Sequence, residues 1–574
     1  MAVENLITEH IKIWTSAVKT KSTSGRGSSN KLELYGVKKL RELILELAVR
    51  GKLVPQDPND EPASDLLVES LKEKDALIKK GIVKKSRSKK TIKEEHFYDY
   101  PASWVVSRLE DLINVVNGRA YKKAEMLSEG TPILRVGNLF TSNDWYYSDL
   151  KLEADKYIDN GDLIYAWSAS FGPFIWDGGK VIYHYHIWKM DIFRETSLDK
   201  EFSKLFLQAI SERIKASGNG IAMIHMTKER MEKVMHPLPP INEQKQIVNR
   251  VNKLMTLCDQ LEQQTEASVE AHQVLVTTLL DTLTNSADAD ELMQNWARIS
   301  EHFDTLFTTE ESIDQLKQTI LQLAVMGKLV PQDPNDEPAA ELLKRIAEEK
   351  AQLVKDKKIK KQKALPPISE DEKPFELPSG WEWCRFDEII DPRFPLSYGV
   401  LVPGNHVEGG VPLVRIGDID LANPAELPEK SISAEIDSKY ERTRLFGGEI
   451  LMAVVGSIGK LGVVPDSWKG ANIARALCRI LPWEGLSKDF LLVLLQSNYM
   501  QNSFTGDTRT LAQPTLNIGL IKNSLTPIPP LSEQLQIVSM VSGLFMVCDH
   551  LKSNIKESQT IQLYLTDAIV EQAV

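Results

Sequence analysis

The chain has 574 residues, of which 42% are hydrophobic and 26% charged, and its formal net charge is -11 at pH 7. This composition excludes a wholly disordered chain, and the length favours roughly three or four domains. Cys258, Cys384, Cys478 and Cys548 are too few and too scattered for a disulfide framework or a Cys-x-x-Cys metal site, which indicates a reducing compartment.

The N-terminus lacks the basic start, apolar core and cleavage site of a secretory signal, and no apolar run comes near the roughly 18 residues of a membrane span. We therefore expect a cytoplasmic protein without a membrane partner. The negative net charge alone argues against nucleic acid, because phosphates are neutralised by Lys and Arg. However, the acidic excess is concentrated between residues 236 and 376, whereas residues 1–96 are basic.

The N-terminal segment carries a helical pattern that leads into a repeated stretch. Residues 1–20 are predicted to form an amphipathic helix, and the Ser- and Gly-rich stretch 21–30 a flexible connector. The next helix ends in Gly-Lys-Leu-Val-Pro-Gln-Asp-Pro-Asn-Asp-Glu-Pro-Ala at 51–63, where Asp60 is expected to cap the following helix. The same 13-letter stretch recurs unchanged at 327–339, so the protein is built from two related halves.

Short apolar runs separated by glycine turns begin near residue 97 and again near residue 377. The landmarks recur in order: Trp104 matches Trp381, 132–138 matches 412–418, and 161–166 matches 448–453. Both segments are therefore predicted to be compact mixed α/β domains on a common frame.

A long helix is predicted after each of these domains, starting at a Pro-Pro-x-x-Glu-Gln segment. Apolar residues then alternate at spacings of four and three for about four heptads, which is the period of a coiled coil. The predicted seam consists of Ile247, Val251, Leu254 and Leu261 in the first helix and Ile537, Val541, Leu544 and Leu551 in the second.

The order of the segments indicates a circular permutation. The first long helix runs on into the repeat, whereas the second ends the chain and its continuation is found at residues 1–80. We therefore expect a pseudo-two-fold organisation in which the N-terminal arm docks beside the C-terminal helix.

The repeats, the paired Pro-Pro-x-x-Glu-Gln helix starts and the two Trp-led domains together resemble the specificity subunit of type I restriction-modification enzymes, over essentially the whole chain. The resemblance implies an α+β fold in which an antiparallel coiled-coil scaffold joins two target-recognition domains. The expected boundaries are 1–96 for an N-terminal helical arm that completes the C-terminal conserved region, 97–236 for the first recognition domain, 237–376 for the central conserved helical region, 377–525 for the second recognition domain, and 526–574 for the C-terminal conserved helix.

The resemblance further implies a non-catalytic chain that recognises a bipartite, asymmetric site in double-stranded DNA. It would hold two modification (methyltransferase) subunits and two restriction subunits, which would use S-adenosylmethionine, ATP and Mg, with adenine N6 as the methylated atom. No cofactor or metal is expected in this chain: it lacks the Asn- or Asp-Pro-Pro-Tyr motif of amino-methyltransferases, and 456–461 matches a phosphate loop only loosely.

Two alternatives stay open on sequence grounds. A coiled-coil protein-interaction scaffold without DNA binding would suit the acidic charge. A self-sufficient nuclease or methyltransferase would need a catalytic motif that the sequence does not display.

Candidate DNA contacts are polar and aromatic residues at strand ends and glycine turns, because Arg reads guanine, Asn and Gln read adenine, and Lys, Arg, Ser, Thr and Tyr meet phosphates. In the first domain they are Arg119, Tyr121, Lys122, Lys123, Arg135, Asn138, Trp167, Ser168, Ser170 and Asn219. In the second domain they are Tyr398, Asn405, His406, Arg415, Ser457, Lys460, Arg509, Thr510 and Gln513. The alternative for each is an ordinary solvated loop residue, and for the equivalent Arg135 and Arg415 a shared structural role.

Overall fold

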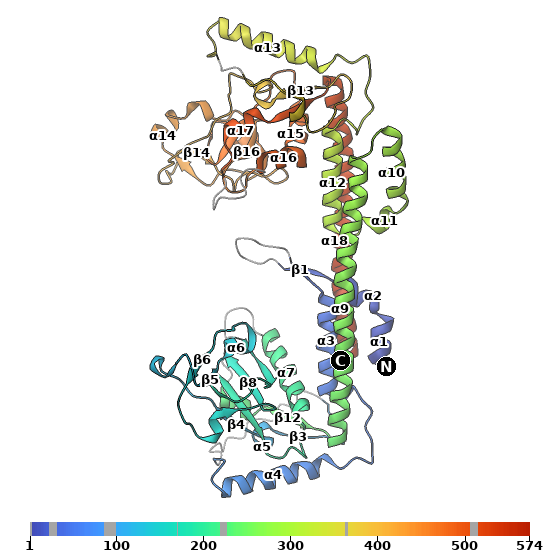
Figure 1. The fold of residues 1–574 in the computed structure, drawn as a ribbon, viewed down its shortest axis with the longest axis vertical. Coiled ribbons are helices and arrows are strands. Elements are labelled where there is room, and N and C mark those ends of the chain that lie inside the picture. Colours follow the sequence, from blue (N-terminus) through green and yellow to red (C-terminus); the bar gives the residue numbers. More distant parts are fainter. Residues whose placement is uncertain are drawn as a thin grey trace. The chain divides into compact units, whose positions relative to one another are not determined.

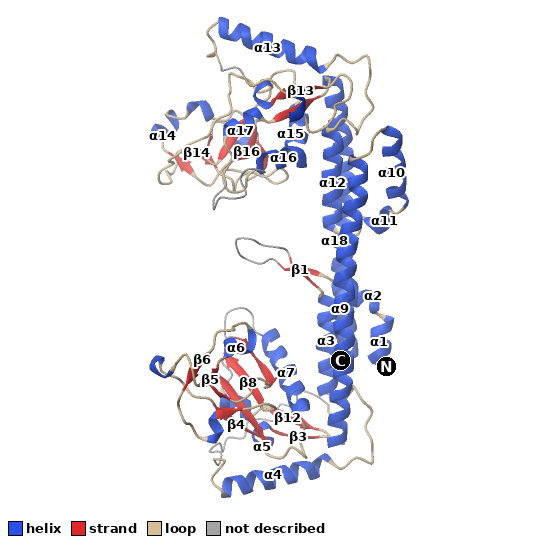
Figure 2. Ribbon diagram, in the orientation of Figure 1, coloured by secondary structure: helices blue, strands red, loops and turns tan. Residues whose placement is uncertain are grey.

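The computed structural model describes residues 3–21, 31–84, 99–168, 170–217, 227–361, 365–505 and 515–574. The chain divides into two compact units, one of residues 1–269 and 558–574 and the other of residues 270–557. Each unit contains helices and one sheet-rich domain, which confirms the mixed fold and the two sheet-rich domains expected from the sequence (Figures 1 and 2).

The helical part of the first unit is centred on α3. It contains α1 Val3–Glu9, α2 Ile11–Ser16, α3 Tyr35–Val49 and α4 Ala63–Lys79, with the first part of α9 Ile241–Thr284 and the last part of α18 Leu531–Ala573. The Tyr35 hydroxyl donates to Asp567 of α18 at 2.7 Å, and Arg41 pairs with Asp259 of α9 at 2.6 Å. Within this unit, therefore, α3 contacts both long helices.

Two local expectations for this region were wrong. The single helix expected over residues 1–20 is divided into α1 and α2, and strands β1 Lys19–Lys21 and β2 Lys31–Glu33 pair antiparallel; residues 22–30 of the expected connector lie outside the described residues. Asp60 does not cap α4, whose N-cap residue is Pro62 with no side-chain bond; instead Asp60 accepts a hydrogen bond from the amide of Asn242, at 2.8 Å. The repeat is thereby tied to the start of α9.

Sheet domain 1 spans residues 105–238 and has two four-stranded sheets, in the orders β6-β5-β10-β7 and β4-β11-β8-β9. Neighbouring strands are antiparallel except β5 and β10, which run parallel with Leu134 opposite Tyr183. The strands are β3 Val105–Arg108, β4 Ile113–Asn117, β5 Thr131–Leu134, β6 Tyr146–Ser148, β7 Tyr157–Ile158, β8 Leu163–Ser168, β9 Ser170–Ile175, β10 Val181–Tyr183, β11 Ile187–Ile192 and β12 Met235–Leu238. The helices are α5 Leu109–Leu112, α6 Val136–Phe140, α7 Lys200–Ser217 and α8 Lys228–Glu232.

The second unit repeats this plan with different details. Its helical part contains α10 Ala289–Glu301, α11 Phe303–Leu306, α12 Glu310–Val325 and α13 Ala339–Lys355, with the last part of α9 and the first part of α18. α12 contacts both long helices, because its Asp314 pairs with Lys552 of α18 at 2.7 Å and its Glu311 accepts a hydrogen bond from Gln273 of α9 at 2.8 Å.

Sheet domain 2 spans residues 382–528 and has two three-stranded sheets, in the orders β15-β14-β18 and β17-β16-β19. β14 and β18 run parallel with Val414 opposite Ile473, which is the counterpart of the β5 and β10 pair. The strands are β13 Glu382–Arg385, β14 Val411–Val414, β15 Ser431–Ile432, β16 Ile450–Ala453, β17 Leu461–Val463, β18 Asn472–Ile473, β19 Leu477–Ile480 and β20 Leu525–Ile528. The helices are α14 Ala434–Ser438, α15 Lys488–Gln496, α16 Asn498–Thr505 and α17 Ile518–Asn523.

The residues predicted to form the seam are buried or partly buried within their units. Ile247, Val251 and Leu254 are buried in the first unit, Ile537 and Val541 in the second, and the remaining three, Leu261, Leu544 and Leu551, are partly buried. Both long helices cross from one unit to the other, α9 after Val269 and α18 after Glu557.

α18 is the one helix among the described residues that is long and apolar enough to cross a membrane, a feature that the search of the sequence missed. Its most apolar window has a mean hydropathy of 1.4, and 28% of that window is buried within the protein. Length and composition do not separate a membrane helix from one whose apolar face packs on protein.

Candidate nucleic-acid interface

Four segments that are far apart in the sequence meet at one edge of sheet domain 1. We call residues 117–123, 135–138, 167–168 and 184–186 the first turn cluster. Backbone hydrogen bonds join them, from Arg119 N to Tyr183 O (3.0 Å), Tyr185 N to Arg119 O (3.0 Å), His184 N to Leu134 O (2.9 Å) and Trp167 N to His186 O (3.1 Å). The turn 184–186, which links β10 to β11, lies at the centre of this network.

Sheet domain 2 repeats the same backbone network. We call residues 398–402, 415–418, 454–460 and 474–476 the second turn cluster. The matching bonds run from Val400 N to Ile473 O (2.7 Å), Arg475 N to Val400 O (2.9 Å), Ala474 N to Val414 O (2.9 Å) and Val454 N to Ala476 O (2.8 Å). The turn 474–476, which links β18 to β19, is therefore the counterpart of the turn 184–186.

The side chains on these two frames differ. The first cluster is aromatic and basic: the Trp167 ring lies 5.0 Å from His186 and 6.0 Å from Tyr185, and the Arg135 guanidinium lies over Tyr146 at 4.3 Å. Partial burial, with His186 and Arg135 close by, lowers the pKa of His184 to about 4. His184 is therefore neutral at physiological pH and can both donate and accept a hydrogen bond.

The second cluster has small residues and cations. Ala474 and Ala476 flank the exposed Arg475, and Ser457 is exposed on the turn between β16 and β17. Arg415 pairs with Glu429 at 3.0 Å, and the Lys460 ammonium donates to Ile416 O at 3.2 Å. One frame thus carries two different sets of exposed groups.

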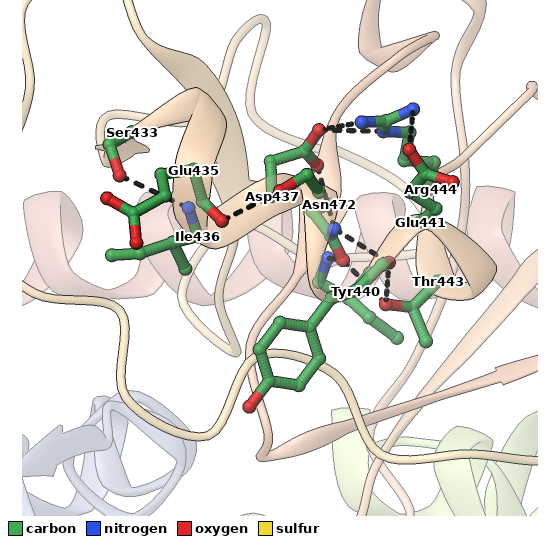
Figure 3. Close-up of polar contacts among 11 residues, drawn as sticks. Ser433, Glu435, Ile436, Asp437, Tyr440, Glu441, Thr443, Arg444 and Asn472 are labelled. Atoms are coloured by element: carbon green, nitrogen blue, oxygen red, sulfur yellow. Dashed lines mark hydrogen bonds and ion pairs between the residues drawn. The ribbon is translucent and has the colours of Figure 1, made fainter.

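A buried polar network fixes the strand that leads to the turn 474–476 (Figure 3). Asn472 donates to Asp437 at 2.9 Å and to Tyr440 O at 3.1 Å, and it accepts from the Thr443 hydroxyl at 2.7 Å. Asp437 also pairs with Arg444. Because Asn472, Thr443 and Asp437 are buried, removing one partner would leave others unsatisfied. The equivalent position in sheet domain 1 is the apolar Ile182, so this support belongs to the second domain.

The same three residue types, Gln, Trp and Glu, lie where each sheet domain meets its helices, and in the second unit they form a complete hydrogen-bonded anchor. In the second unit Glu533, at the start of α18, accepts from the Gln332 amide at 3.1 Å and from the Trp381 indole at 2.9 Å. Gln332 belongs to the repeat and Trp381 begins the sheet domain, so one buried carboxylate links repeat, domain and long helix. We call this arrangement the Glu socket.

The first unit has the equivalent residues Glu243, Gln56 and Trp104. Gln56 donates to Glu243 at 2.8 Å, while the Trp104 indole nitrogen and Glu243 Oε2 miss hydrogen-bond geometry, and neither has a partner among the described residues. Burial raises the pKa of both Glu243 and Glu533. For Glu533, the hydrogen bonds from Gln332 and Trp381 oppose this rise. The Gln that both repeats share thereby acquires a structural role.

Comparisons with known proteins give one consistent answer. The family model for the type I restriction modification DNA specificity domain matches residues 101–271 and 405–558. The specificity subunits of the type I restriction enzymes EcoAI and EcoEI of Escherichia coli are each 40% identical to this chain, and the alignments cover 100% of both chains. The chain belongs to the type I restriction-modification specificity subunit family.

A solved structure of a type I R-M system, titled for its complex assembly and conformational transition, has a TM-score of 0.47 and 19% identity over 83% of this chain and 98% of that chain. Each of the two matched segments of the specificity family model starts in or beside a sheet domain and ends in a long helix, α9 or α18. Specificity subunits are the non-catalytic members of type I systems, as the missing catalytic motifs led us to expect.

The turn clusters of this specificity protein contain many of the residues selected from the sequence. Arg119, Lys122, Lys123, Arg135, Trp167 and Ser168 lie in the first cluster and Tyr398, Arg415, Ser457 and Lys460 in the second. Several also have internal partners: Arg119 pairs with Glu125 at 2.7 Å, and the Tyr398 hydroxyl donates to Leu516 O at 3.1 Å. Asn405 and His406 lie in a separate exposed loop, where His406 Nδ1 accepts from Ser431 N.

Two of the candidates, Tyr121 and Asn138, support the structure of the domain itself. Tyr121 is 8% exposed and packs with Ile133 and Ile182, and burial raises its pKa to about 12. The Asn138 side chain accepts from Arg135 N at 3.1 Å, as Asp418 accepts from Arg415 N at 2.6 Å, which gives the two equivalent turns a common support. Asn219, Arg509, Thr510, Gln513 and the side chain of Ser170 lie outside the described residues.

The sequence alone does not identify the tip residue of either cluster. Tyr185 and Arg475 lie at the tips of the equivalent turns and are exposed. Arg475 stands between two alanines and matches no motif, and the two turns share no residue that would align them. The two turns could be matched only by the number of residues that separate each of them from the preceding shared landmark of its domain. Interpreting that number requires knowledge of the strand pairing.

Proposed function

We propose that this chain is the DNA-specificity subunit of a type I restriction-modification complex and recognises a bipartite, asymmetric sequence in double-stranded DNA. The observation that carries the proposal is the repeated backbone network of the two turn clusters, which presents dissimilar side chains. Two turn clusters that have the same backbone but different exposed side chains are suited to recognise two different half-sites. The chain would supply recognition and no catalytic step.

The proposal includes the division of the chain given by the sequence: recognition domains at 97–236 and 377–525, and conserved helical regions at 1–96, 237–376 and 526–574. The helical regions would form an antiparallel coiled coil with a circularly permuted order, and would set the spacing of the half-sites. Support comes from matched contacts: Lys52 donates to Val574 O at 2.7 Å as Lys328 donates to Thr284 O at 2.9 Å. The N-terminal arm thus meets the last turn of α18 as the second repeat meets the last turn of α9.

The proposed partners are two modification subunits and two restriction subunits, which would bring S-adenosylmethionine, ATP and Mg, in the cytoplasm. α18 offers a surface for a protein partner, because Leu535 and Met546 are exposed although large and apolar. They are 11 residues apart in the sequence, about three helical turns, and so lie on the same side of the helix. Exposed apolar residues that gather on one face are typical of a binding surface.

The test is to map methylated adenines in cells that express the modification subunit with and without this chain. The proposal expects a split asymmetric motif that is methylated only when the chain is present. A methylation map that does not depend on the chain would overturn it, and would favour the alternative of a protein scaffold without DNA binding, which the exposed face of α18 also suits.

A further inference from the structure

Arg475 lies at the tip of the turn 474–476. Backbone hydrogen bonds fix this turn, but the Arg475 side chain has no partner among the described residues. The amides of Ala474 and Arg475 and the carbonyl of Ala476 all take part in the backbone network of the second turn cluster. The Leu477 amide closes the turn by donating to Ala474 O at 2.9 Å. The turn is thus held on both sides, which places the Arg475 side chain on a rigid support.

Arg475 differs from its neighbouring cations. Arg415 pairs with Glu429 and with Asp418, and Lys460 donates to a backbone carbonyl. Within the described part of the chain the Arg475 guanidinium has no hydrogen-bond or ion-pair partner, and its two neighbours are alanines that leave it clear. A guanidinium that is free of internal partners on a fixed turn is available for an external acceptor.

The equivalent position in sheet domain 1 carries different chemistry. There the turn is His184-Tyr185-His186, and the Tyr185 ring lies 4.4 Å from His184 and 3.9 Å from His186. The backbone of the two turns is matched bond for bond, including Ile187 N to His184 O at 2.9 Å, the counterpart of Leu477 N to Ala474 O. The side chain at the tip has therefore changed while its support has not.

We propose that positions 185 and 475 are equivalent specificity-determining positions, and that Arg475 reads a guanine in the half-site recognised by sheet domain 2. The inference rests on the proposed function. Arg is the side chain that makes the commonest specific base contact, a bidentate pair with guanine O6 and N7 in the major groove. Tyr185, held by three rings, presents a hydroxyl at the same place and reads a different base edge.

The first experiment compares Arg475→Ala and Arg475→Lys with wild type in a methylation map of randomised half-sites, in the complex with the modification subunit. Arg475→Ala should lower the preference for guanine at one position about 5- to 150-fold and leave the other half-site unchanged. Arg475→Lys should also lose preference, because an ammonium cannot make the bidentate contact. Arg442→Ala is the matched control: Arg442 is an exposed arginine of the same domain, in the 3-10 turn Glu441–Thr443 that packs on the start of β18.

The outcomes separate the possibilities. A uniform loss of methylation over all sites in Arg475→Ala, with normal methylation in Arg475→Lys, would show that Arg475 contacts a phosphate and would overturn the proposal. An unchanged motif, or a change in both half-sites, would also overturn it. A wild-type map without any split motif would instead overturn the proposed function. Melting temperatures should match wild type, because the Arg475 side chain has no partner among the described residues.

The second experiment transplants the turn. A triple variant gives sheet domain 1 the side chains of the other turn on a matched backbone. It combines His184→Ala, Tyr185→Arg and His186→Ala. We expect a new guanine preference at one position of the first half-site. A first half-site that keeps its original bases would show that the tip is not where the base is read, provided that the variant still methylates DNA; if it does not, Arg475→Ala decides the question alone.

Discussion

The Glu socket joins three distant parts of the chain through one buried carboxylate. Glu533 meets the repeat through Gln332 and the sheet domain through Trp381; the Gln332 amide also donates to Gly327 O and Val330 O, whereas the buried Trp381 indole relies on Glu533 as its acceptor. A buried donor that loses its acceptor costs on the order of 1–3 kcal/mol.

We therefore expect Glu533→Ala to lower the free energy of unfolding of the second unit by about that amount, measured by urea denaturation. Glu533→Gln keeps an acceptor and should cost less. Because burial raises the pKa of Glu533, the folded state binds its proton more tightly than the unfolded state, so this residue's contribution falls as pH rises above the usual 4.5. Glu533→Gln should remove that fall, and equal losses for the Ala and Gln variants would contradict the role given to the carboxylate.

His236 gives the first unit a pH dependence from a position that does not titrate in the second unit. It is fully buried, Ser203 lies 3.0 Å from its Nε2, and burial lowers its pKa from 6.5 to about 4. The equivalent residue in the second unit is Thr526, which does not titrate.

Because the folded state holds His236 neutral, the stabilising contribution is complete above pH 6.5 and is lost as pH falls toward 4. The loss should be about 1.4 kcal/mol for each pH unit in that range. We expect His236→Thr, which supplies the residue of the other unit, to flatten the dependence between pH 7.5 and 5, as followed by hydrogen exchange of the first unit. Equal slopes in wild type and variant would refute this assignment.

At the scale of elements, the repeat is a turn that fits against the entrance of each sheet domain. Gly327 ends α12 with a positive φ of 70°, and a Cβ there would lie 2.4 Å from Pro378 and 3.1 Å from Trp381. Gly51 has the same conformation against Pro101 and Trp104. Both the backbone angle and the close packing require glycine.

Gly81 separates these two causes. Its φ is 74°, but a Cβ there would meet nothing within 4 Å. Gly81→Ala should cost about 1 kcal/mol for the backbone angle alone, whereas Gly327→Ala should cost a further 1–3 kcal/mol for the forced displacement of Pro378. Thermal denaturation of the two variants measures the difference; equal losses would show that the contact does not matter.

The sequence predicted the elements that depend on local pattern or on repetition. The helix before the first repeat, the apolar positions of the long helices and the two Trp-led domains all follow from spacing or internal comparison. It did not predict contacts between distant residues: Asp60 was assigned to the nearest helix and instead bonds Asn242. Arg475 and the buried position of Tyr121 depend on strand pairing, which no local pattern encodes.

At the scale of the molecule, the two long helices are the elements that both units share. If they set the distance between the half-sites, adding one heptad to each helix, after Val269 and after Glu557, should lengthen it. Seven residues add about 10 Å of helix, close to three base pairs of duplex. A methylation map should show the same two half-sites with about three more base pairs between them.

The control inserts the heptad into α9 alone, which should destabilise the protein because the two helices no longer match in length. An unchanged gap in the double insertion would mean that the helices do not determine the spacing.

The Glu socket also bears on how such proteins acquire new specificities. A sheet domain meets the repeat and the long helix through a proline and a tryptophan at its start, Pro101 and Trp104 or Pro378 and Trp381. A foreign domain that brings these two residues would find the glycine of the repeat and the glutamate of the long helix already in place. Genetic exchange with crossovers in the repeat and at the start of the long helix would then replace one half-site in a single event, without a period in which the protein cannot fold.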